Sequence, residues 1–545
     1  MFYRIFLVLF LFIDLLFAAD IQVFDDDIKT GDTVLWTSDN VYHLNGFVFV
    51  DSGAVLKIEA GTVIKGKPGQ GENASALIIA RGAKIYAEGT REKPIIFTAE
   101  ADDLTKPDDI PLDASGLWGG LILLGRARIN TAAGEGHIEG IPETEPRGAY
   151  GGNNDHDNSG ILRYVSVRYG GTDIGAGNEI NGITFGAVGD STVVDYVEVF
   201  GNNDDGMEFF GGTVCLKHIV LAYNKDDNFD TDEGFRGKGQ FLFVLQSPDF
   251  GDRAGEHDGG TEPEDGTPYA KFTFFNATFI GSGVNSSNLD NMTLKIRDNS
   301  GGCYCNSIFT DFAGIGIDIE DLESGADSRE RLECGDLLIK NNIWWNFGKG
   351  NDWLTIAHNK EWIKDSLLAM NNVLEDPLLK SISRINNKML DPRPSNNSPA
   401  FENLTEYPED GFFEKVNFKG AFGKELWIKG WTFLDNAGFI VNTQNTDINE
   451  NTNDIKTSFE LLGNYPNPFN PSTKIVFSIH KPSKVELSVY NIMGEKVATL
   501  LNNSFHTAGK YNVVWNPSDN IGSGTYFYIL RVKDSVKVGK MILLR

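Results

Sequence analysis

Two acidic clusters with the same spacing lie near the middle of the chain, and clustered acidic side chains have the chemistry of a metal site. Residues 196–208 align without a gap on residues 218–230, so that Asp204 falls on Asp226 at an offset of 22 residues. An apolar run, a turn rich in Gly, Asn and Asp, and a constant offset predict successive coils of a β-solenoid. The candidate metal ligands are Asp204, Asp205, Glu208, Asp226, Asp227, Asp230 and Asp232.

Stacked coils would place these carboxylates one above another. Residues in adjacent parallel strands lie about 4.8 Å apart, and unpaired carboxylates at that distance repel each other. Ca²⁺ would compensate them, because it takes about six to eight oxygen ligands in irregular geometry and is plentiful outside cells. The alternative is a hydrated row of turn side chains, partly neutralised by Lys225, Arg236 and Lys238. Both interpretations stay open, with Ca²⁺ as the candidate cofactor.

A second charged stretch follows these clusters. Residues 247–268 are rich in Gly, Pro and acidic residues, which is typical of a surface loop with a binding role. The candidate binding residues come from this stretch and from two basic residues that precede it. They are Arg236, Lys238, Arg253, Glu256, His257 and Asp258. A lone histidine among carboxylates is equally typical of a surface loop held by ion pairs.

Carboxylates beside basic residues also suggest polysaccharide chemistry. Polygalacturonases carry Asp-Asp, Gly-His-Gly and Arg-Ile-Lys motifs, whereas residues 256–258 here read Glu-His-Asp and residues 295–297 reverse the basic pair. The acid and base pairing needed for hydrolysis is therefore incomplete. We expect a non-enzymatic binding, adhesive or structural protein, with a polysaccharide lyase or glycoside hydrolase acting on acidic polysaccharide as the alternative. That alternative requires that four residues converge on one groove, namely Asp204, Asp226, Arg236 and His257.

The composition argues against several classes of partner. The chain has 545 residues, a formal net charge of −28 and a pI near 4.7, so bulk electrostatics disfavour nucleic acid and anionic lipid. Residues 1–19 have the charged, apolar and small-residue regions of a secretory signal peptide,. No later segment is long and apolar enough to span a bilayer. An exported protein is therefore expected.

The next four hundred or so residues predict an all-β architecture, a right-handed parallel β-helix. Short β-branched and aromatic runs that end in Gly turns recur along residues 20–441,. Long polar excursions at residues 101–115 and 130–159 are expected to be loops on one side. Asn residues that precede apolar pairs predict side-chain amides stacked along the axis. Residues 391–431, rich in Pro and aromatics, are expected to cap the open end.

The cysteines are Cys215, Cys303, Cys305 and Cys334. In an exported chain we expect one or two disulfides or buried free thiols, and the spacing does not assign a pairing. A metal site at Cys303 and Cys305 is disfavoured, because the usual gap of two residues between metal-binding cysteines is absent.

The end of the chain changes character. Residues 442–457 are rich in Asn, Thr and Asp, which predicts a linker, and residues 458–545 alternate as the strands of a small antiparallel β-sandwich,. Three motifs in order, at 463–473, 489–500 and 524–530, resemble the type A C-terminal sorting domain of the type IX (Por) secretion system. The resemblance implies that the outer-membrane translocon of that system is a partner, and that the rest of the chain becomes surface-attached or released.

The solenoid also resembles a known group. Residues 61–66, 118–125 and 232–241 are similar to stretches of exported β-helix proteins from bacteria that use this secretion system. That resemblance implies fold and location but no reaction. We therefore expect a secreted surface protein whose ligand is a polysaccharide or another cell-surface molecule.

Overall fold

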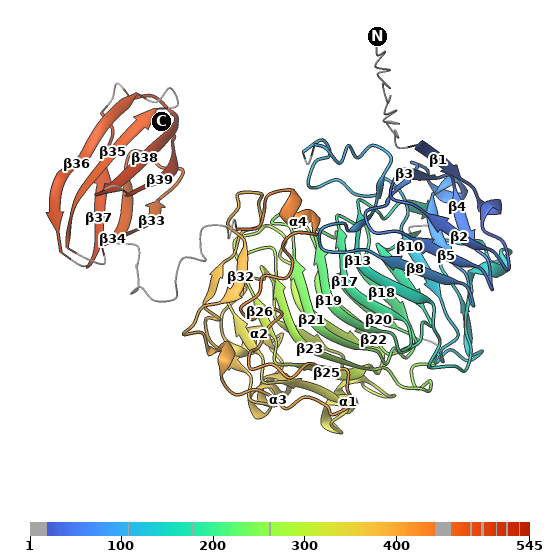
Figure 1. Ribbon diagram of the computed structural model, residues 1–545. Helices are drawn as coiled ribbons and strands as arrows, with labels where there is room; N and C mark the ends of the chain where they lie inside the picture. The colour runs from blue at the N-terminus through green and yellow to red at the C-terminus, as the bar shows by residue number, and fades with distance from the viewer. Residues whose placement is uncertain are drawn as a thin grey trace, which may run out of the picture. The chain divides into compact units, whose positions relative to one another are not determined.

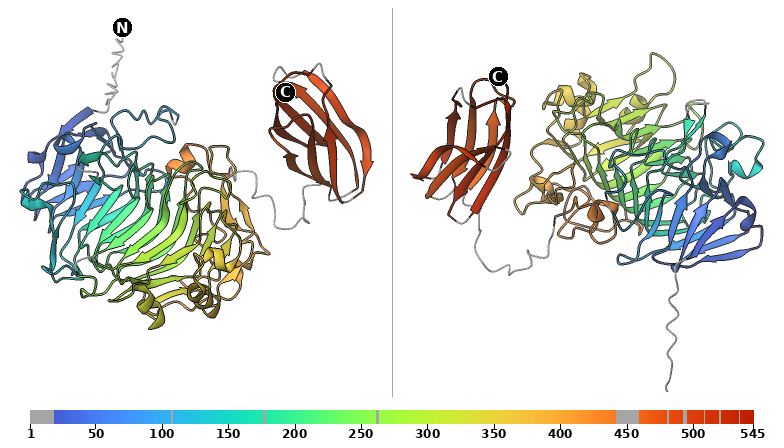
Figure 2. Two further views of the ribbon diagram at one scale, coloured as in Figure 1. Left: turned by 180° about the vertical axis from the view of Figure 1, so that it is seen from behind. Right: turned by 90° about the horizontal axis from the view of Figure 1, so that it is seen from above.

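Coils built of parallel strands make up the larger of the two units of the chain (Figures 1 and 2). The computed structural model describes residues 19–106, 108–175, 178–260, 263–441, 459–479, 482–491, 495–507, 509–518, 521–533 and 535–545. The chain divides into two units, one ending at Asn442 and one beginning at Thr443, and each has its own hydrophobic core. Residues 1–18 of the predicted signal peptide and the predicted linker 442–457 lie outside the described residues.

One face of each coil belongs to a nine-stranded parallel sheet. Its strands are β4 (Phe47–Val50), β7 (Ala76–Ile79), β10 (Leu121–Leu124), β16 (Ile183–Gly186), β18 (Met207–Phe210), β20 (Phe229–Asp232), β22 (Arg253–Asp258), β24 (Met292–Arg297) and β27 (Ile317–Ile319). Side chains alternate along each strand, so that Met207 and Phe209 are fully buried while Glu208 between them is partly exposed. The predicted parallel β-helix is confirmed.

A seventeen-stranded sheet forms the rest of the coils. Its strands are β1 (Ala19–Val23), β2 (Thr33–Trp36), β3 (Asn40–Leu44), β5 (Val55–Ile58), β6 (Val63–Gly66), β8 (Lys84–Glu88), β9 (Ile95–Ala99), β13 (Gly160–Arg168), β17 (Val193–Phe200), β19 (Cys215–Ala222), β21 (Lys238–Leu245), β23 (Lys271–Ile280), β25 (Gly301–Cys305), β26 (Ile308–Thr310), β28 (Leu337–Lys340), β29 (Ile343–Trp345) and β30 (Val373–Leu374). The central strands are long because each replaces two shorter ones: β13 pairs with both β8 and β9.

Each long central strand bends at one residue with a positive φ. These residues are Tyr164, Tyr196, His218, Phe241 and Asn276, with φ between 49° and 60°. Residues other than glycine rarely adopt this left-handed backbone conformation. The rings stack at centroid separations of 4.4 Å (Tyr164 to Tyr196), 4.1 Å (Tyr196 to His218) and 5.0 Å (His218 to Phe241). The alignment of Tyr196 with His218 in the sequence thus corresponds to a stack of rings at one corner of the solenoid.

The predicted amide stacking is present at some of the asparagines. Asn202 N donates to Asn224 Oδ1 at 3.1 Å, and Asn342 N donates to Asn372 Oδ1 at 3.1 Å. The corner residue Asn276 instead donates to the backbone of the C-terminal segment of the solenoid unit. Amides at different positions of the coil therefore serve different purposes.

That C-terminal segment, residues 400–441, lies along the side of the solenoid, and we call it the strap. The prediction was that residues 391–431 cap the open end, and for residues 400–431 it is wrong, because they lie against the side of the coils. Asn306 exchanges two hydrogen bonds with Thr405, of 2.9 and 2.7 Å, and Gln240 exchanges two with Glu414, both of 2.8 Å. These side-chain amides offer a donor and an acceptor as a strand edge does, and so they hold an extended backbone against the coils.

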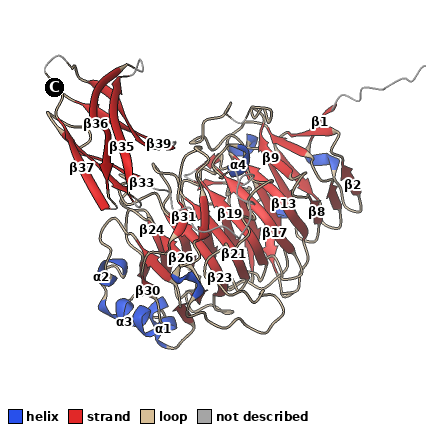
Figure 3. Ribbon diagram, turned by 60° about the vertical axis from the view of Figure 1, so that its left-hand side comes forward, coloured by secondary structure: helices blue, strands red, loops and turns tan. Residues whose placement is uncertain are grey.

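Short helices and strands occur between the last coils and within the strap (Figure 3). They are α1 (Ser328–Glu333), α2 (Trp353–Ile356), α3 (Glu361–Ala369), β31 (Leu379–Ser381), β32 (Asp391–Pro394), the 3₁₀ helix η4 (Pro399–Phe401) and α4 (Phe433–Asn436). Trp431 packs edge-on to the rings of Tyr164 and Tyr196, at 5.6 and 6.1 Å. The strap thereby covers part of the aromatic corner, where Tyr164 and Tyr196 are half-buried.

A buried carboxylate fixes the strap where α4 begins. Glu198 is fully buried and accepts hydrogen bonds from Phe433 N at 2.6 Å and Leu434 N at 3.3 Å. It also accepts one from Ser166 Oγ at 2.6 Å, and that hydroxyl accepts one from Arg168 Nε at 2.8 Å. Burial raises the pKa of the Glu198 carboxyl. Removal of this side chain would leave the two strap amides without their acceptor.

We expect Glu198→Ala to lower the free energy of unfolding by about 3–5 kcal/mol, the usual cost of breaking a buried charged network. Chemical denaturation of the full chain measures the change. Glu88→Ala is the control: Glu88 lies 3.5 Å from Arg163 on the surface, where a pair contributes about 0–1 kcal/mol. A Glu198→Ala protein within 1 kcal/mol of the control would contradict the role assigned to Glu198.

The excursion at 130–159 forms a second layer over the nine-stranded sheet. Its Ile138, Ile141 and Tyr150 pack with Ile122 and Leu124 on the outer side of that sheet. The excursion therefore covers the sheet and contributes buried apolar side chains.

The remaining short elements are η1 (Asp25–Asp27), η2 (Gly71–Asn73), β11 (Glu135–His137), η3 (Pro146–Gly148), β12 (Ala149–Gly151), β14 (Asp173–Gly175) and β15 (Asn178–Glu179).

All four cysteines are free, so the expected disulfides are not formed. Cys303 and Cys305 lie two residues apart in β25 and are buried beside Phe275 and Phe413. Cys215 is half-buried in β19, and Cys334 is exposed. The alternative expectation of buried free thiols holds for the pair in β25.

The second unit is a pair of antiparallel sheets. Strands β33 (Phe459–Tyr465), β34 (Thr473–Ile479) and β37 (Gly509–Trp515) form one sheet. Strands β36 (Lys496–His506), β35 (Ser483–Asn491), β38 (Gly524–Val532) and β39 (Ser535–Leu543) form the other, in that order. Phe477, Leu487 and Leu530 are fully buried in the core of this unit. The predicted antiparallel β-sandwich is confirmed.

Candidate functional site

The acidic residues predicted from the repeat stack on the outer face of the nine-stranded sheet. Glu208 of β18 pairs with Asp230 of β20, and Asp230 pairs with Glu256 of β22. Parallel register thus places three carboxylates in one column, about 4.8 Å from strand to strand. The offset of 22 residues predicted the first pair, and Glu256 continues the column.

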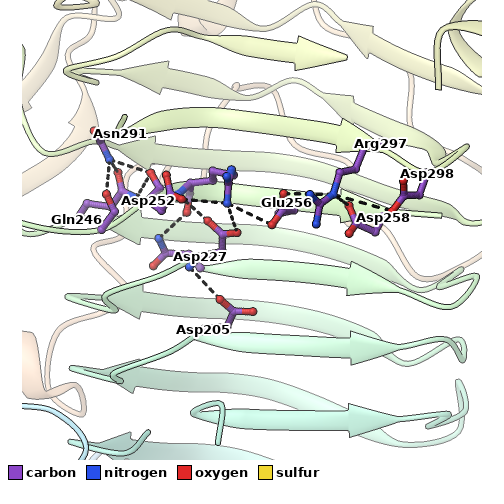
Figure 4. Close-up of polar contacts among 12 residues, drawn as sticks. Asp205, Asp227, Gln246, Asp252, Glu256, Asp258, Asn291, Arg297 and Asp298 are labelled. Carbon is purple, nitrogen blue, oxygen red and sulfur yellow. Dashed lines mark hydrogen bonds and ion pairs between the residues drawn. The ribbon is translucent and has the colours of Figure 1, made fainter. Parts of the chain in front are cut away.

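The turns before these strands add a second row of carboxylates. Asp227 N donates to Asp205 Oδ1 at 2.9 Å, and Arg253 N donates to Asp227 Oδ1 at 2.6 Å. One oxygen of each aspartate thus accepts a hydrogen bond from the backbone of the next coil. Figure 4 shows Asp205 and Asp227 in succession across the strands, with Asp252 and Glu256 beyond them.

The two rows enclose a hollow of about 250 Å³, which we call the acidic hollow. It is lined by Glu139, Glu179, Asn181, Asp204, Asp205, Glu208, Asp226, Asp227, Asp230 and Glu256. Asp205, Asp227 and Glu256 are buried, whereas Asp226 and Glu139 are exposed at its rim. Nine carboxyl groups and one amide make a lining of oxygen-rich side chains.

Burial makes the ionised form of these carboxyls costly. It raises the pKa of Asp205, Glu208, Asp227 and Asp230 well above the ordinary range, and neighbouring carboxylates add to the effect,. Burial also raises the pKa of Asp204 to about 7, with Asp226 as the strongest neighbouring charge. Without a compensating cation, several of these groups are expected to hold protons at neutral pH.

Three sets of carboxylates are close enough to share an ion. Asp204, Asp205 and Asp226 form the first set, in which one oxygen of each residue lies within 4.8 Å of the others. The second set is Asp205, Asp227 and Asp230, and the third is Asp226, Asp227 and Asp252. Asp205 belongs to the first two sets, so that they are contiguous.

Two oxygens at the hollow are buried without a hydrogen-bond partner. They are Asp230 Oδ1 and Glu256 Oε1. Glu256 as a residue is only 6% exposed. A buried acceptor that is left unsatisfied costs about 1–3 kcal/mol, and more when it is charged. Asp230 Oδ1 is therefore available as a ligand, whereas Glu256 Oε1 lies 3.6 Å from Arg297 Nε.

The predicted neutralising cations do not line the hollow. Lys225 donates to Asn203 Oδ1 at 3.1 Å, Arg236 pairs with Asp155 at 2.9 Å, and Lys238 pairs with Asp410 at 2.6 Å. The sequence-based expectation that they neutralise the acidic row is wrong, because each points to a different part of the solenoid. Arg253 is the main basic residue in contact with the lining among the described residues. Its guanidinium pairs with Asp227 and with Glu256.

Of the predicted binding residues, three come together on this face. Arg253 contacts Glu256, and Asp258 is paired with Arg297 at 2.7 Å. The prediction that residues 253–258 belong to a surface loop is wrong, because they form strand β22.

His257 is not on this face. It is fully buried inside the solenoid, with Nδ1 2.9 Å from Thr231 Oγ1 and Nε2 2.8 Å from Tyr304 Oη. Burial lowers the pKa of His257 to about 3. Strand alternation explains the misplacement, since Glu256 and Asp258 face outward and the residue between them must face inward.

Three lining residues and one predicted ligand differ from the sequence expectation. Glu139 and Glu179 line the hollow but were missed, because they reach it from an excursion and a hairpin outside the repeat. Asn181 was missed as well: it lies one coil before Asp205, whose N donates to Asn181 Oδ1 at 3.2 Å. Asp232 does not line the hollow; it pairs in register with Phe210 in the neighbouring column. The constellation required by the enzyme alternative is not formed, since Arg236 and His257 lie away from Asp204 and Asp226.

Comparison with known families places this face in context. The family model for the pectate-lyase like beta helix domain matches residues 27–356, more than half of the chain. The chain belongs to the pectate-lyase like beta helix domain family. The comparisons with curated proteins and with solved structures found no match.

The C-terminal unit has its own family match. A secretion system C-terminal sorting domain matches residues 464–544 of this pectate-lyase like β-helix protein. The domain indicates export by type IX secretion to the cell surface or beyond, and the machinery of that system is its partner. Within the described ranges, the helices are all too short or too polar to cross a membrane.

The raised pKa values predict an unusual pH dependence for the chelator-treated protein. Asp204 has a folded-state pKa of about 7 against 3.8 for an ordinary aspartate, so the folded state binds more protons between these values,. The free energy of unfolding should therefore fall as pH rises from 5 to 7.5, as measured by denaturation in excess chelator.

The control for this pH profile is the double variant Asp204→Asn, Asp227→Asn, which removes two of the titrating groups. Its profile should be flatter than that of the wild type. Parallel profiles would show that the hollow does not titrate in this range.

Proposed function

We propose that the solenoid is a Ca²⁺-dependent binding or structural element of the cell surface, with the ions held in the acidic hollow. One observation carries the proposal: buried carboxylates of Asp205, Asp227 and Glu256 line a hollow made of nine carboxyl groups and one amide. Buried charges of one sign require compensation. A bound cation supplies it and fixes the turns of several coils at once.

The donor set favours Ca²⁺ over other metals. The lining contains carboxylate and amide oxygens and neither histidine nor cysteine, which disfavours zinc and the softer transition metals. Mg²⁺ requires near-octahedral geometry and retains its waters, whereas Ca²⁺ accepts many oxygens at irregular angles. Side chains drawn from turns, strands and a hairpin suit the larger ion.

The family description names pectate lyases, so cleavage of an acidic polysaccharide is the second candidate function. Arg253 and Arg297 on the same face favour the binding of an anionic sugar chain, since guanidinium groups pair well with carboxylates,. Arg253, however, is already paired with Asp227, Asp252 and Glu256. That arrangement supports ligand binding better than proton abstraction. Release of unsaturated or reducing ends from an acidic polysaccharide would establish cleavage.

Excess Ca²⁺ should raise the midpoint of thermal unfolding of the solenoid, relative to excess chelator, by about 2–5 °C. An ion present at about 100 times its Kd contributes about 2.7 kcal/mol per site, and a large domain converts this to a few degrees. Asp205→Asn should abolish most of the shift, because Asp205 belongs to two of the three carboxylate sets.

The matched control is Asp113→Asn, the same substitution at an exposed residue outside the hollow. It should keep the full Ca²⁺ shift. Equal midpoints with Ca²⁺ and with chelator in the wild type would refute the cation proposal and leave the carboxylates as protonated or hydrated groups.

A further inference from the structure

We infer that the acidic hollow takes two cations bridged by Asp205, and that the guanidinium of Arg253 fills the place of a third. The inference rests on the proposed function and concerns the number and position of the ions. Groups of carboxylates repeat along the solenoid. In one of these groups, the guanidinium of Arg253 already supplies the positive charge.

The carboxylate sets repeat along the solenoid axis. The first set, Asp204, Asp205 and Asp226, joins the turns of two successive coils. The second, Asp205, Asp227 and Asp230, shares Asp205 with the first and extends to the outer face of β20. Two ions about one coil spacing apart can share the two oxygens of one carboxylate.

The next position along the axis already holds a cation. Arg253 Nη1 lies 3.2 Å from Asp227 Oδ2, 3.0 Å from Asp252 Oδ2 and 3.2 Å from Glu256 Oε2. One positive group thus sits among three carboxylates from neighbouring coils. This contact indicates that each group of stacked carboxylates in the acidic hollow requires a positive charge. Arg253 also reaches Asp227 of the second set, whereas among the described residues the carboxylates of Asp204, Asp205 and Asp230 form no ion pair with a basic side chain.

An unsatisfied oxygen points to the second set. Asp230 Oδ1 is buried without a hydrogen-bond partner. Glu256 is in neither set, and its two oxygens already face guanidinium groups, Oε2 that of Arg253 at 3.2 Å and Oε1 that of Arg297 at 3.6 Å. An ion in the second set would give the buried oxygen of Asp230 a partner.

Charge supports two ions over one. Nine carboxyl groups line the hollow, and Arg253 and Arg297 supply two positive charges beside them, both at the Glu256 end. One divalent ion would leave the first or the second set uncompensated, and its carboxylates would have to keep their protons. Two ions serve both sets, and the shared Asp205 lies between them and screens their mutual repulsion.

The test is the number of Ca²⁺ ions bound per chain, measured by equilibrium dialysis of the full-length protein after removal of metal. The wild type should bind two. Asp204→Asn and Asp230→Asn should each lower the number to one, and Asp205→Asn should lower it to zero. Asp113→Asn should leave it at two.

Arg253→Met tests the stand-in role of the guanidinium. It removes the charge and keeps a long side chain, and so it should open a third site and raise the number of bound ions to three. If this variant fails to fold, the numbers for Asp204→Asn and Asp230→Asn still decide between one ion and two. A folded Arg253→Met protein that binds two ions would overturn the stand-in role.

The two proposals fail in different ways. No Ca²⁺ bound by the wild type would overturn both the proposed function and this inference. One ion per chain, lost in Asp204→Asn and in Asp230→Asn alike, would overturn the two-ion arrangement and leave the proposed function intact.

Discussion

Residues in successive coils of the solenoid stand about 4.8 Å apart, because hydrogen bonds between parallel strands join one coil to the next. Like residues therefore stack on like residues. Where the stacked groups attract, as the rings of Tyr196 and His218 do, the spacing stabilises the coil. Where they repel, as Asp205 and Asp227 do, the spacing creates a requirement for positive charge or for protons.

The outer face of the nine-stranded sheet meets this constraint in three ways. Toward the N-terminus, the excursion 130–159 covers apolar side chains. Toward the C-terminus the column alternates in sign, from Glu256 to Lys295 to Asp318. Lys295 and Lys360 both pair with Asp318, and despite its burial they lower the pKa of that carboxyl. The stretch from Glu208 to Glu256 stacks carboxylates without alternation, and there the acidic hollow opens.

The repeat made much of this predictable. An offset of 22 residues predicted the coils, the stacking of Asp204 on Asp226 and the acidic row, because register in a parallel solenoid follows directly from sequence period,. Motifs at the C-terminus predicted the sorting domain. Side-chain direction was harder: His257 was placed with its acidic neighbours, although strand alternation turns it into the core.

Contacts between distant segments were beyond a repeat-based prediction. Glu139 and Glu179 reach the hollow from outside the repeat, and Arg236 pairs with Asp155, which lies 81 residues earlier. The position of the strap depends on single side chains such as Gln240 and Glu198, whose partners lie more than 170 residues away. Such contacts leave no periodic signal in one sequence.

The central claim is that the acidic hollow is a cation site. A crystal structure of the full chain at neutral pH in millimolar Ca²⁺ is its most direct test. We predict density for ions between Asp204, Asp205 and Asp226 and between Asp205, Asp227 and Asp230, with oxygen–ion distances of about 2.3–2.6 Å. Pairs of carboxyl groups in direct hydrogen bonds, with protons or water in place of ions, would contradict it.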